Sequence, residues 1–144
     1  MGRKIKVGLL QMPISSDLEQ NKIRLKENII SCAAKGVQLV VLQELHNTPY
    51  FCQTENTEYF NLAEKIPGSS TDFYSAIARE NNVVLVTSLF EARAAGLYHN
   101  TSVVFDSDGS IAGKYRKMHI PDDPAYYEKF TGNRTIRNMH FTIF

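Results

Sequence analysis

The chain has 144 residues, 43% of them hydrophobic and 22% charged, with a formal net charge of +1. This composition is ordinary for a single globular domain in water. A net charge so close to zero argues against a nucleic-acid surface, which needs a marked basic excess. No apolar run approaches the roughly 20 residues of a transmembrane helix, and the N-terminus lacks the apolar stretch of a signal peptide. We therefore expect no nucleic-acid partner and no membrane association.

The first strand is predicted over residues 4–12, with Gly8 inside it, where a neighbouring element can approach closely. Asp17 followed by Gln20 forms a partial capping box, and it predicts a helix that runs up to a C-terminal stop at Gly36. Apolar residues at helical spacing give this helix one buried face. The expected apolar stripe consists of Leu25, Ile29 and Cys32, widened by Ile23 and Ile30.

The second strand is predicted over residues 37–45 and contains a run of four apolar residues, 39–42. Such a run is typical of an inner strand of an α/β sheet. Glu44 falls at its C-terminal end, where open α/β sheets place their ligand sites. Taken alone, Glu44 is equally consistent with an ion pair or a helix cap. Because an unpaired buried carboxylate is costly, we expect a basic partner for it.

The rest of the chain predicts one long connection, one helix and three strands. Residues 46–67 form an irregular segment, longer than most connections and rich in aromatic residues. A helix is expected over residues 72–81, and strands over 83–91, 98–106 and 111–115. The tight turns between the last three strands imply antiparallel pairing. The order β-α-β-α-β-β-β therefore predicts an α/β fold with a mixed sheet and helices on one face.

The end of the last predicted strand carries three basic residues, Lys114, Arg116 and Lys117, shortly before Pro121. Strand alternation places Lys117 on the opposite side from Arg116. One interpretation is a solvated face that protects a sheet edge. The other is a basic side chain held in a site at the point where a strand becomes a stiffened loop.

Two motifs decide between these interpretations. Leu-Gln-Glu-Leu at 42–45 and Tyr-Arg-Lys-Met-His-Ile-Pro at 115–121 resemble the nitrilase (carbon–nitrogen hydrolase) superfamily. Within it, Pro-Tyr-Phe-Cys-Gln at 49–53 and Asp-Asp-Pro-Ala-Tyr-Tyr-Glu-Lys-Phe at 122–130 are most similar to N-carbamoylputrescine amidases. The resemblance covers about residues 5–130. It implies one half of a four-layer α-β-β-α sandwich.

The resemblance also implies a reaction. It suggests hydrolysis of a linear N-carbamoyl amine such as N-carbamoylputrescine, in putrescine and polyamine biosynthesis, by Glu-Lys-Cys thiol catalysis. Glu44 would be the general base, Lys117 would stabilise the oxyanion, and Glu128 would orient the lysine and the water. The nucleophilic cysteine lies in the second half of family members and is absent here, so the chain by itself is expected to be inactive.

The predicted substrate-binding residues are Tyr50, Phe51 and His119. The resemblance implies that the segment with Tyr50 and Phe51 forms part of the pocket wall, and His119, which shares a face with Lys117, is expected to supply a supporting hydrogen bond near the site. The aromatic pair could equally anchor the loop, and His119 could be a structural histidine. Cys32 is expected to be a core thiol, while the resemblance places Cys52 beside the pocket in a non-nucleophilic position. No metal-ligand spacing is present, so we expect neither metal nor cofactor, and free thiols point to the cytoplasm.

Residues 131–144 have no counterpart in the resemblance, so we divide the chain into 1–130 and an unmatched tail that looks frame-shifted or truncated. A half sandwich would leave one apolar sheet face uncovered, which favours association. Family members commonly form homo-oligomers. The alternative function is a non-catalytic remnant or interaction module. A nucleotide-binding domain is disfavoured, because no glycine-rich phosphate motif follows the first strand.

Overall fold

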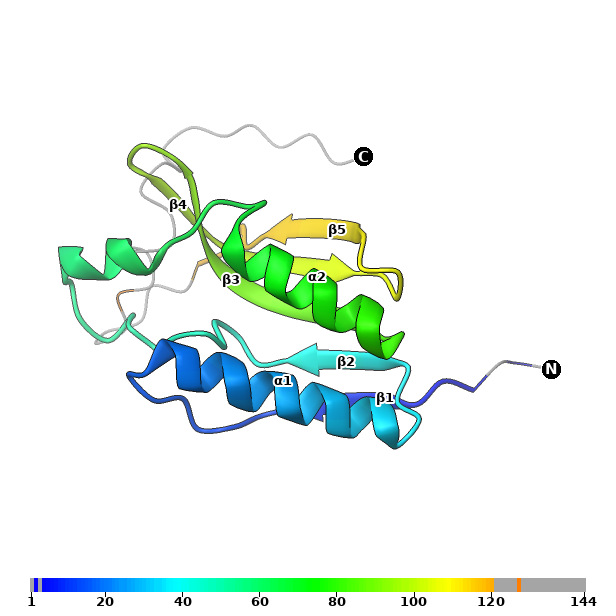
Figure 1. Ribbon diagram of the computed structural model, residues 1–144. Coiled ribbons are helices and arrows are strands. Elements are labelled where there is room, and N and C mark those ends of the chain that lie inside the picture. The colour runs from blue at the N-terminus through cyan, green and yellow to red at the C-terminus, as the bar shows by residue number, and fades with distance from the viewer. Residues whose placement is uncertain (1, 3, 121–126, 128–144) are drawn as a thin grey trace.

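The structure is a computed structural model that describes residue 2, residues 4–120 and residue 127. It contains one five-stranded sheet whose strand order in space equals the order in sequence (Figure 1). The elements are β1 (Val7–Leu10), α1 (Leu18–Ala34), β2 (Leu39–Leu42), the 3-10 helix η1 (Thr57–Leu62), α2 (Ser69–Asn81), β3 (Val84–Ala94), β4 (Leu97–Phe105) and β5 (Ile111–Arg116).

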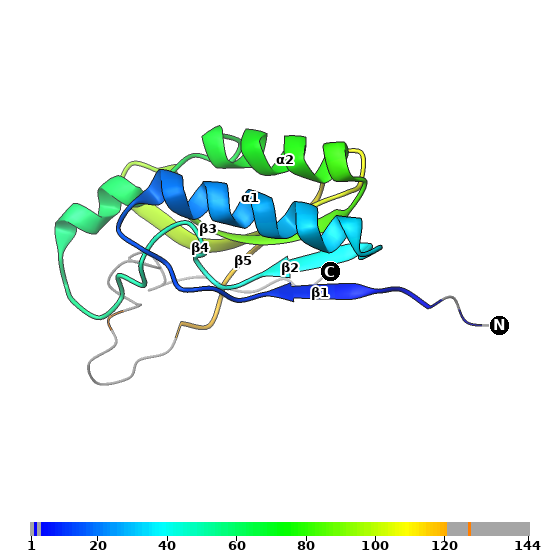
Figure 2. The ribbon, with the colours of Figure 1, turned by 60° about the horizontal axis from the view of Figure 1, so that its bottom comes forward.

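The sheet is mixed, as predicted. β1, β2 and β3 pair in parallel, while β3–β4 and β4–β5 are antiparallel. Parallel neighbours need crossover connections, and because these crossovers share one hand, α1 and α2 lie on the same side of the sheet. Figure 2 shows both helices covering one face. The predicted order of elements and the placement of helices on one face are confirmed.

Local signals set the boundaries of α1 close to the predicted ones. The Asp17 carboxylate caps the helix by accepting the Gln20 backbone N–H at 3.0 Å. Gly36 follows the C-terminus with a φ of 76°, a conformation that a glycine adopts without strain. The predicted widening of the apolar stripe is wrong, because Ile23 and Ile30 are 49% and 41% exposed. Both residues point away from the sheet.

α2 begins three residues earlier than the predicted residue 72. The Thr71 hydroxyl accepts the Gly68 N–H and donates to the Gly68 carbonyl, both at 2.7 Å, which fixes the first turn. At the other end, Asn82 takes a left-handed conformation with a φ of 51° and stops the helix at Asn81, the predicted last residue. The start of α2 is therefore set by hydrogen bonds with the turn before the helix and not by the spacing of its apolar residues.

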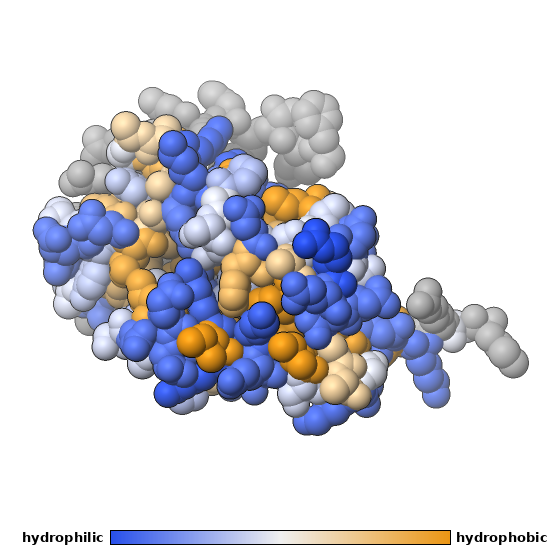
Figure 3. All heavy atoms as spheres, in the orientation of Figure 1, coloured by the Kyte–Doolittle hydropathy of each residue, from blue (hydrophilic) through white to orange (hydrophobic). Residues whose placement is uncertain are grey.

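The main core lies between the two helices and the sheet. Gly8 allows the end of α1 to approach β1: a Cβ there would lie 3.1 Å from Val37 Cγ1 and 3.2 Å from Cys32 Sγ. This close approach confirms the role predicted for Gly8. Seen from the helix side, the surface is mainly hydrophilic with separate hydrophobic spots (Figure 3). The buried core residues are Leu25, Ile29, Val37, Val40, Leu42, Tyr74, Ile77, Ala78, Val83, Leu85, Leu89, Val103 and Phe105.

A second, smaller cluster organises the long segment 46–67. Its buried members are Leu45, Phe51, Cys52 and Phe90. The rings of Phe51 and Phe90 lie 4.8 Å apart. Aromatic pairs of this kind bury large areas, so they hold an otherwise irregular connection against the end of β3. Packing in this cluster anchors the connection, which contains only the short helix η1.

The opposite face of the sheet carries apolar side chains. On β1, Leu10 packs against the core, so the alternating residues Val7 and Leu9 point the other way, and Leu9 is 78% exposed. Tyr115 on β5 is also exposed. Both described α-helices cover the other face of the sheet (Figure 2). The predicted uncovered face is therefore present in the described part of the chain.

Candidate active site

Two strand ends bring an acid and an amine together. Glu44 lies two residues beyond β2, and Lys117 directly follows β5. β5 is antiparallel to β4, which is antiparallel to β3, so β2 and β5 end at the same edge of the sheet. Lys117 Nζ lies 3.1 Å from Glu44 Oε1, although 73 positions separate the residues in sequence. The predicted convergence of these residues is present.

Asn100 on β4 contacts both members of this pair. Its side-chain Nδ2 donates to Glu44 Oε1 at 2.7 Å, and its backbone carbonyl accepts the Lys117 N–H at 2.8 Å. Asn100 is only 6% exposed. Asn100 was not predicted as a site residue from the sequence. The available signal was a polar amide in the middle of a strand, since buried amides are nearly always hydrogen-bonded.

An open hollow of about 420 Å³ lies beside Glu44. Tyr50, which was predicted from the sequence as a substrate-binding residue, lines it and is 40% exposed. Phe51 lies instead in the buried aromatic cluster, where it packs on Tyr59 and Phe90. The geometry thus favours the loop-anchor interpretation for Phe51. The hollow is lined by Ile14, Gln43, Glu44, Thr48, Pro49, Tyr50 and Gln53.

The remaining predicted site residues are not brought into this pair. His119 is exposed on the segment after β5, and no hydrogen bond from it to another described residue is present. Glu128 lies outside the described residues. Cys32 packs at the edge of the main core, and Cys52 is 1% exposed in the aromatic cluster. Neither thiol lines the hollow beside Glu44.

The turn that carries Glu44 is backed by buried polar groups. Leu45 has a φ of 49°, which is uncommon for a residue with a side chain. Its N–H donates to Ser88 Oγ at 3.0 Å, and this bond holds the turn to β3. The next residue, His46, is fully buried with Nδ1 3.3 Å from the Tyr74 hydroxyl. Burial lowers the pKa of His46 to about 3, so the imidazole is neutral at physiological pH.

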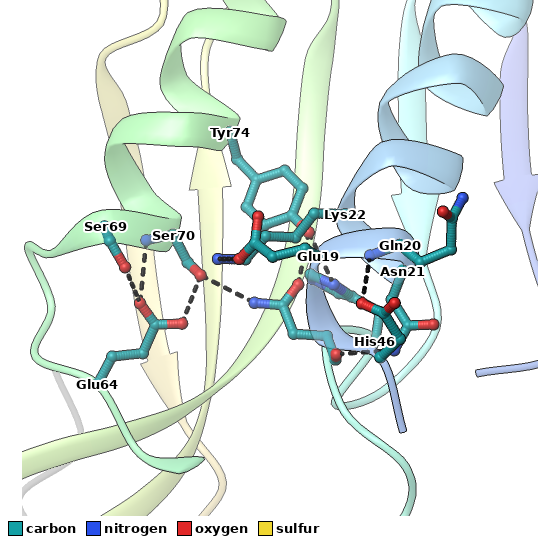
Figure 4. A network of polar contacts seen from close by, with 11 residues as sticks. Glu19, Gln20, Asn21, Lys22, His46, Glu64, Ser69, Ser70 and Tyr74 are labelled. Carbon is teal, nitrogen blue, oxygen red and sulfur yellow. Dashed lines mark hydrogen bonds and ion pairs between the residues drawn. The ribbon is translucent and has the colours of Figure 1, made fainter. Parts of the chain in front are cut away.

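A chain of hydrogen bonds continues from this turn to the start of α2 (Figure 4). Tyr74 donates its hydroxyl proton to Asn47 Oδ1 at 2.5 Å, and Asn47 Nδ2 donates to Ser70 Oγ at 2.9 Å. The Glu64 carboxylate accepts from Ser70 N–H at 3.0 Å and from Ser69 Oγ at 2.9 Å. A carboxylate is favourable at a helix N-terminus. The network therefore fixes the turn against α2.

The other basic residues near the end of β5 have a separate partner. The carboxylate of Glu91, almost fully buried, accepts from Arg116 Nε and Nη2, both at 2.7 Å, and from Thr101 at 2.7 Å. Lys114 lies 3.5 Å from the same carboxylate. Burial alone would raise the pKa of Glu91, but the bonds from Arg116 and Thr101 outweigh it and lower the pKa to about 2. Arg116 and Lys114 therefore do not form the purely solvent-exposed face of a sheet edge that was one interpretation of the sequence.

Among the described residues, no group of three or more His, Cys, Asp or Glu side chains is arranged to hold a metal ion. Within that same part of the chain, no helix is long and apolar enough to span a bilayer.

Comparison with known proteins agrees with this geometry. Residues 6–142 match the family described as carbon-nitrogen hydrolase, so the match extends past residue 130 into the segment treated above as a tail. The citrullinase of Francisella tularensis is 38% identical over 127 residues, covering 88% of this chain and 44% of that protein. The N-carbamoylputrescine amidase of Oryza sativa is 35% identical over 150 positions, covering 99% of this chain and 49% of that protein. The chain belongs to the carbon–nitrogen hydrolase family.

Solved structures show the same fold. A carbon-nitrogen hydrolase from Helicobacter pylori superimposes with a TM-score of 0.82 at 46% identity, over 90% of this chain and 44% of that chain. A nitrilase-superfamily protein from Saccharomyces cerevisiae superimposes with a TM-score of 0.68 at 30% identity, covering 80% of this chain and 44% of that chain. The chain spans about half the length of the curated relatives it matches, so it is a partial domain of the nitrilase fold.

Proposed function

We propose that this chain is the N-terminal half of an amidohydrolase that acts on a linear N-carbamoyl amine such as N-carbamoylputrescine, in putrescine biosynthesis. The observation that carries the proposal is the contact between Glu44 and Lys117 beside an open hollow. Two relatives support the carbamoyl group as the reacting part: one is an N-carbamoylputrescine amidase and another is a citrullinase. Both names refer to compounds that carry a terminal carbamoyl group on nitrogen.

The proposed chemistry divides between this chain and a thiol outside it. Glu44 takes the proton of the attacking thiol, and Lys117 stabilises the negative charge that develops on the carbonyl oxygen. The thiolate attacks the carbamoyl carbon, and the bond from that carbon to the terminal nitrogen breaks as Glu44 returns the proton, so ammonia leaves and a covalent thiocarbamate remains. Water then hydrolyses the thiocarbamate, which regenerates the thiol, and the carbamic acid decomposes to carbon dioxide and the amine. Cys32 and Cys52 are packed in core clusters. The nucleophile therefore has to come from residues that complete the domain.

The hollow itself favours a polar, extended substrate. Tyr50 and Gln53 offer hydrogen-bonding groups on its wall, and Glu44 is the one acid among its described lining residues. Because Glu44 is used by Lys117, the ammonium of a diamine needs a second carboxylate. Glu55 and Glu58 on the following segment are candidates, as are acids outside this chain.

The test is ammonia release from N-carbamoylputrescine and from citrulline. The purified 144-residue chain should release none. A chimera that joins residues 1–120 to the remaining part of the Helicobacter pylori relative, which is 46% identical, should release it. Preference for citrulline would move the substrate assignment to a carbamoyl amino acid. A chimera that folds but hydrolyses neither compound would refute the proposal.

Single substitutions in the active chimera test the assigned roles. Glu44→Gln removes the base and Lys117→Ala removes the charge that faces the oxyanion. Each should lower kcat by at least about 100-fold, since general-base and oxyanion groups contribute that much or more. Glu27→Gln, on the exposed face of α1, is the matched control and should keep kcat. Turnover retained in either active-site variant would contradict the assignment.

A second candidate function is a non-catalytic module that associates with other chains. The exposed apolar residues on the open sheet face favour it, together with the half-length match to the relatives. If mixing the 144-residue chain with a separately expressed second half restores turnover, the chain is both an associating module and half of the enzyme. Binding of that half with no turnover would favour the module.

A further inference from the structure

The two carboxylate oxygens of Glu44 differ in their contacts with the described residues. Lys117 Nζ at 3.1 Å and Asn100 Nδ2 at 2.7 Å both contact Oε1. In the described part of the chain, Oε2 has no hydrogen bond or ion pair. Glu44 is 49% exposed at its side chain and lines the hollow. One oxygen is therefore anchored, and the other is available to a reactant.

The orientation of the Asn100 amide follows from its neighbours. Ser88 Oγ accepts the Leu45 N–H at 3.0 Å, so its own proton is free to donate to Asn100 Oδ1 at 3.2 Å. With Oδ1 accepting from Ser88, Nδ2 has to face Glu44, which can only accept when ionised. Leu45 follows Glu44 directly, so the four residues form a closed ring of contacts. This ring leaves the amide one consistent orientation.

Asn100 also fixes the position of the lysine. Its backbone carbonyl accepts the Lys117 N–H at 2.8 Å, which continues the pairing of β4 beyond the end of β5. Asn100 thus positions Glu44 through its side chain and Lys117 through its backbone. Long side chains such as Glu and Lys otherwise lose little energy by changing rotamer at an exposed site.

We propose that Asn100, oriented by Ser88, is a positioning residue that holds Glu44 by Oε1 and thereby leaves Oε2 as the oxygen that takes the proton. Asn100 acts through Glu44 and contacts no reacting atom itself. The proposal rests on the proposed function, because it gives Glu44 the role of base. It adds which carboxylate oxygen reacts and which residues select it.

The first experiment needs no catalysis. In amide NMR spectra of the 144-residue chain, Glu44→Gln should move one Asn100 Nδ2 proton upfield, since a bond to a charged acceptor becomes a bond to a neutral one. Ser88→Ala should broaden or shift the same protons by releasing Oδ1. Asn81 Nδ2, which donates to the Ile77 carbonyl at 2.8 Å at the C-terminal end of α2, is the internal control and should not move. Unchanged Asn100 protons in both variants would overturn the proposal.

The second experiment uses the active chimera. Asn100→Leu removes the donor and should lower kcat about 10- to 100-fold with little change in KM, the loss expected for one hydrogen bond to a charged group. Ser88→Ala should lower kcat less, and Ser88→Thr, which keeps the hydroxyl, should restore it. Asn81→Leu, which removes a hydrogen bond at the C-terminal end of α2, should leave both constants unchanged. Equal effects on kcat and KM that follow the loss of stability would overturn the positioning role.

The two experiments separate this proposal from the proposed function. If the parent chimera hydrolyses no carbamoyl substrate, the proposed function fails, while the NMR result still decides whether Asn100 holds Glu44. If the chimera is active and Asn100→Leu turns over like the parent, the positioning role fails and the proposed function stands.

Discussion

At the scale of single residues, two acid–base pairs at the same region of the sheet have opposite characters. Glu91 is buried and accepts two bonds from Arg116, with Thr101 on the same carboxylate. Glu44 is half-exposed, and Lys117 touches one oxygen of it. Breaking a buried pair leaves an uncompensated charge, whereas an exposed pair adds little stability. The first pair therefore stabilises the fold, whereas the second contributes little to stability, which is compatible with the catalytic role proposed for it.

The Glu91 pair predicts acid sensitivity. Because the folded pKa of about 2 lies below the ordinary value of 4.5, the pair contributes stability above about pH 4.5 and loses it as pH falls toward 2. The full contribution is on the order of 2–3 kcal/mol. Urea unfolding of the chain should show this loss between about pH 5 and about pH 3. Glu91→Gln should be less stable at neutral pH and lack that part of the decline. An equal decline in the variant would contradict the assignment.

His46 predicts a separate effect at milder pH. Its folded pKa of about 3 lies below the ordinary 6.5, so the unfolded chain binds a proton first and stability falls as pH drops below about 6.5. Between about pH 6.5 and about pH 5 the free energy of unfolding should fall by about 1.4 kcal/mol per unit from this residue. His46→Gln should remove that slope. The exposed His119→Gln is the control, and a slope that it alone removes would refute the prediction.

At the scale of elements, the turn between β4 and β5 is fitted to α2. Gly109 has a φ of 86°, and its carbonyl accepts from Ser75 Oγ at 2.5 Å. A Cβ at Gly109 would lie 2.7 Å from the Ser75 backbone oxygen. The hairpin that delivers Lys117 is thereby held against the helix layer.

Gly109→Ala should therefore destabilise the chain by more than the cost of its backbone conformation. We expect a loss of about 2–3 kcal/mol in the free energy of unfolding, part from the left-handed φ and part from the clash with the backbone of α2. Gly96→Ala, with a φ of 70° and nothing within 4 Å of its Cβ, should lose only about 1 kcal/mol. Denaturant titration measures both, and equal losses would refute the proposed contact.

At the scale of the whole molecule, the chain is a two-layer structure that spans about half the length of the relatives it matches. Its helices cover one face of the sheet (Figure 2), and apolar residues such as Val7, Leu9 and Tyr115 are exposed elsewhere. Each sheet face that carries apolar side chains is stabilised by a covering layer. A surface of this kind favours association when the layer is missing.

This face predicts concentration-dependent association of the isolated chain. Leu9→Lys places a charge on the exposed sheet face and should reduce the average mass seen by sedimentation. Ile30→Lys changes an exposed isoleucine on α1, in the helix layer, and is the matched control. Reduced association in the control variant alone would assign the contact to the helix layer instead.

The sequence predicted much of this structure. Neighbouring residues were enough to predict the helix ends at Asp17 and Gly36, the apolar run before Glu44 and the order of elements. Helix caps and the spacing of apolar residues are local features of a sequence. The exposure of Ile23 and Ile30 was not predicted, since it depends on which side of α1 meets the sheet. Phe51 was weighed equally as a pocket wall and an anchor, and its ring packing on Phe90 favours the anchor.

By itself the sequence determined the family, the mixed α/β architecture and the two strand ends that carry Glu44 and Lys117. Only the tertiary structure decided how these ends are joined. Asn100 lies 56 positions from Glu44, and Ser88 lies 43 positions from Leu45. Such partners depend on strand order and register, which long-range packing decides, so a local pattern can mark a buried amide in a strand but cannot say which residue it contacts. Glu44 and Lys117 were therefore predicted from the sequence, whereas the residues that hold them in place were identified only in the fold.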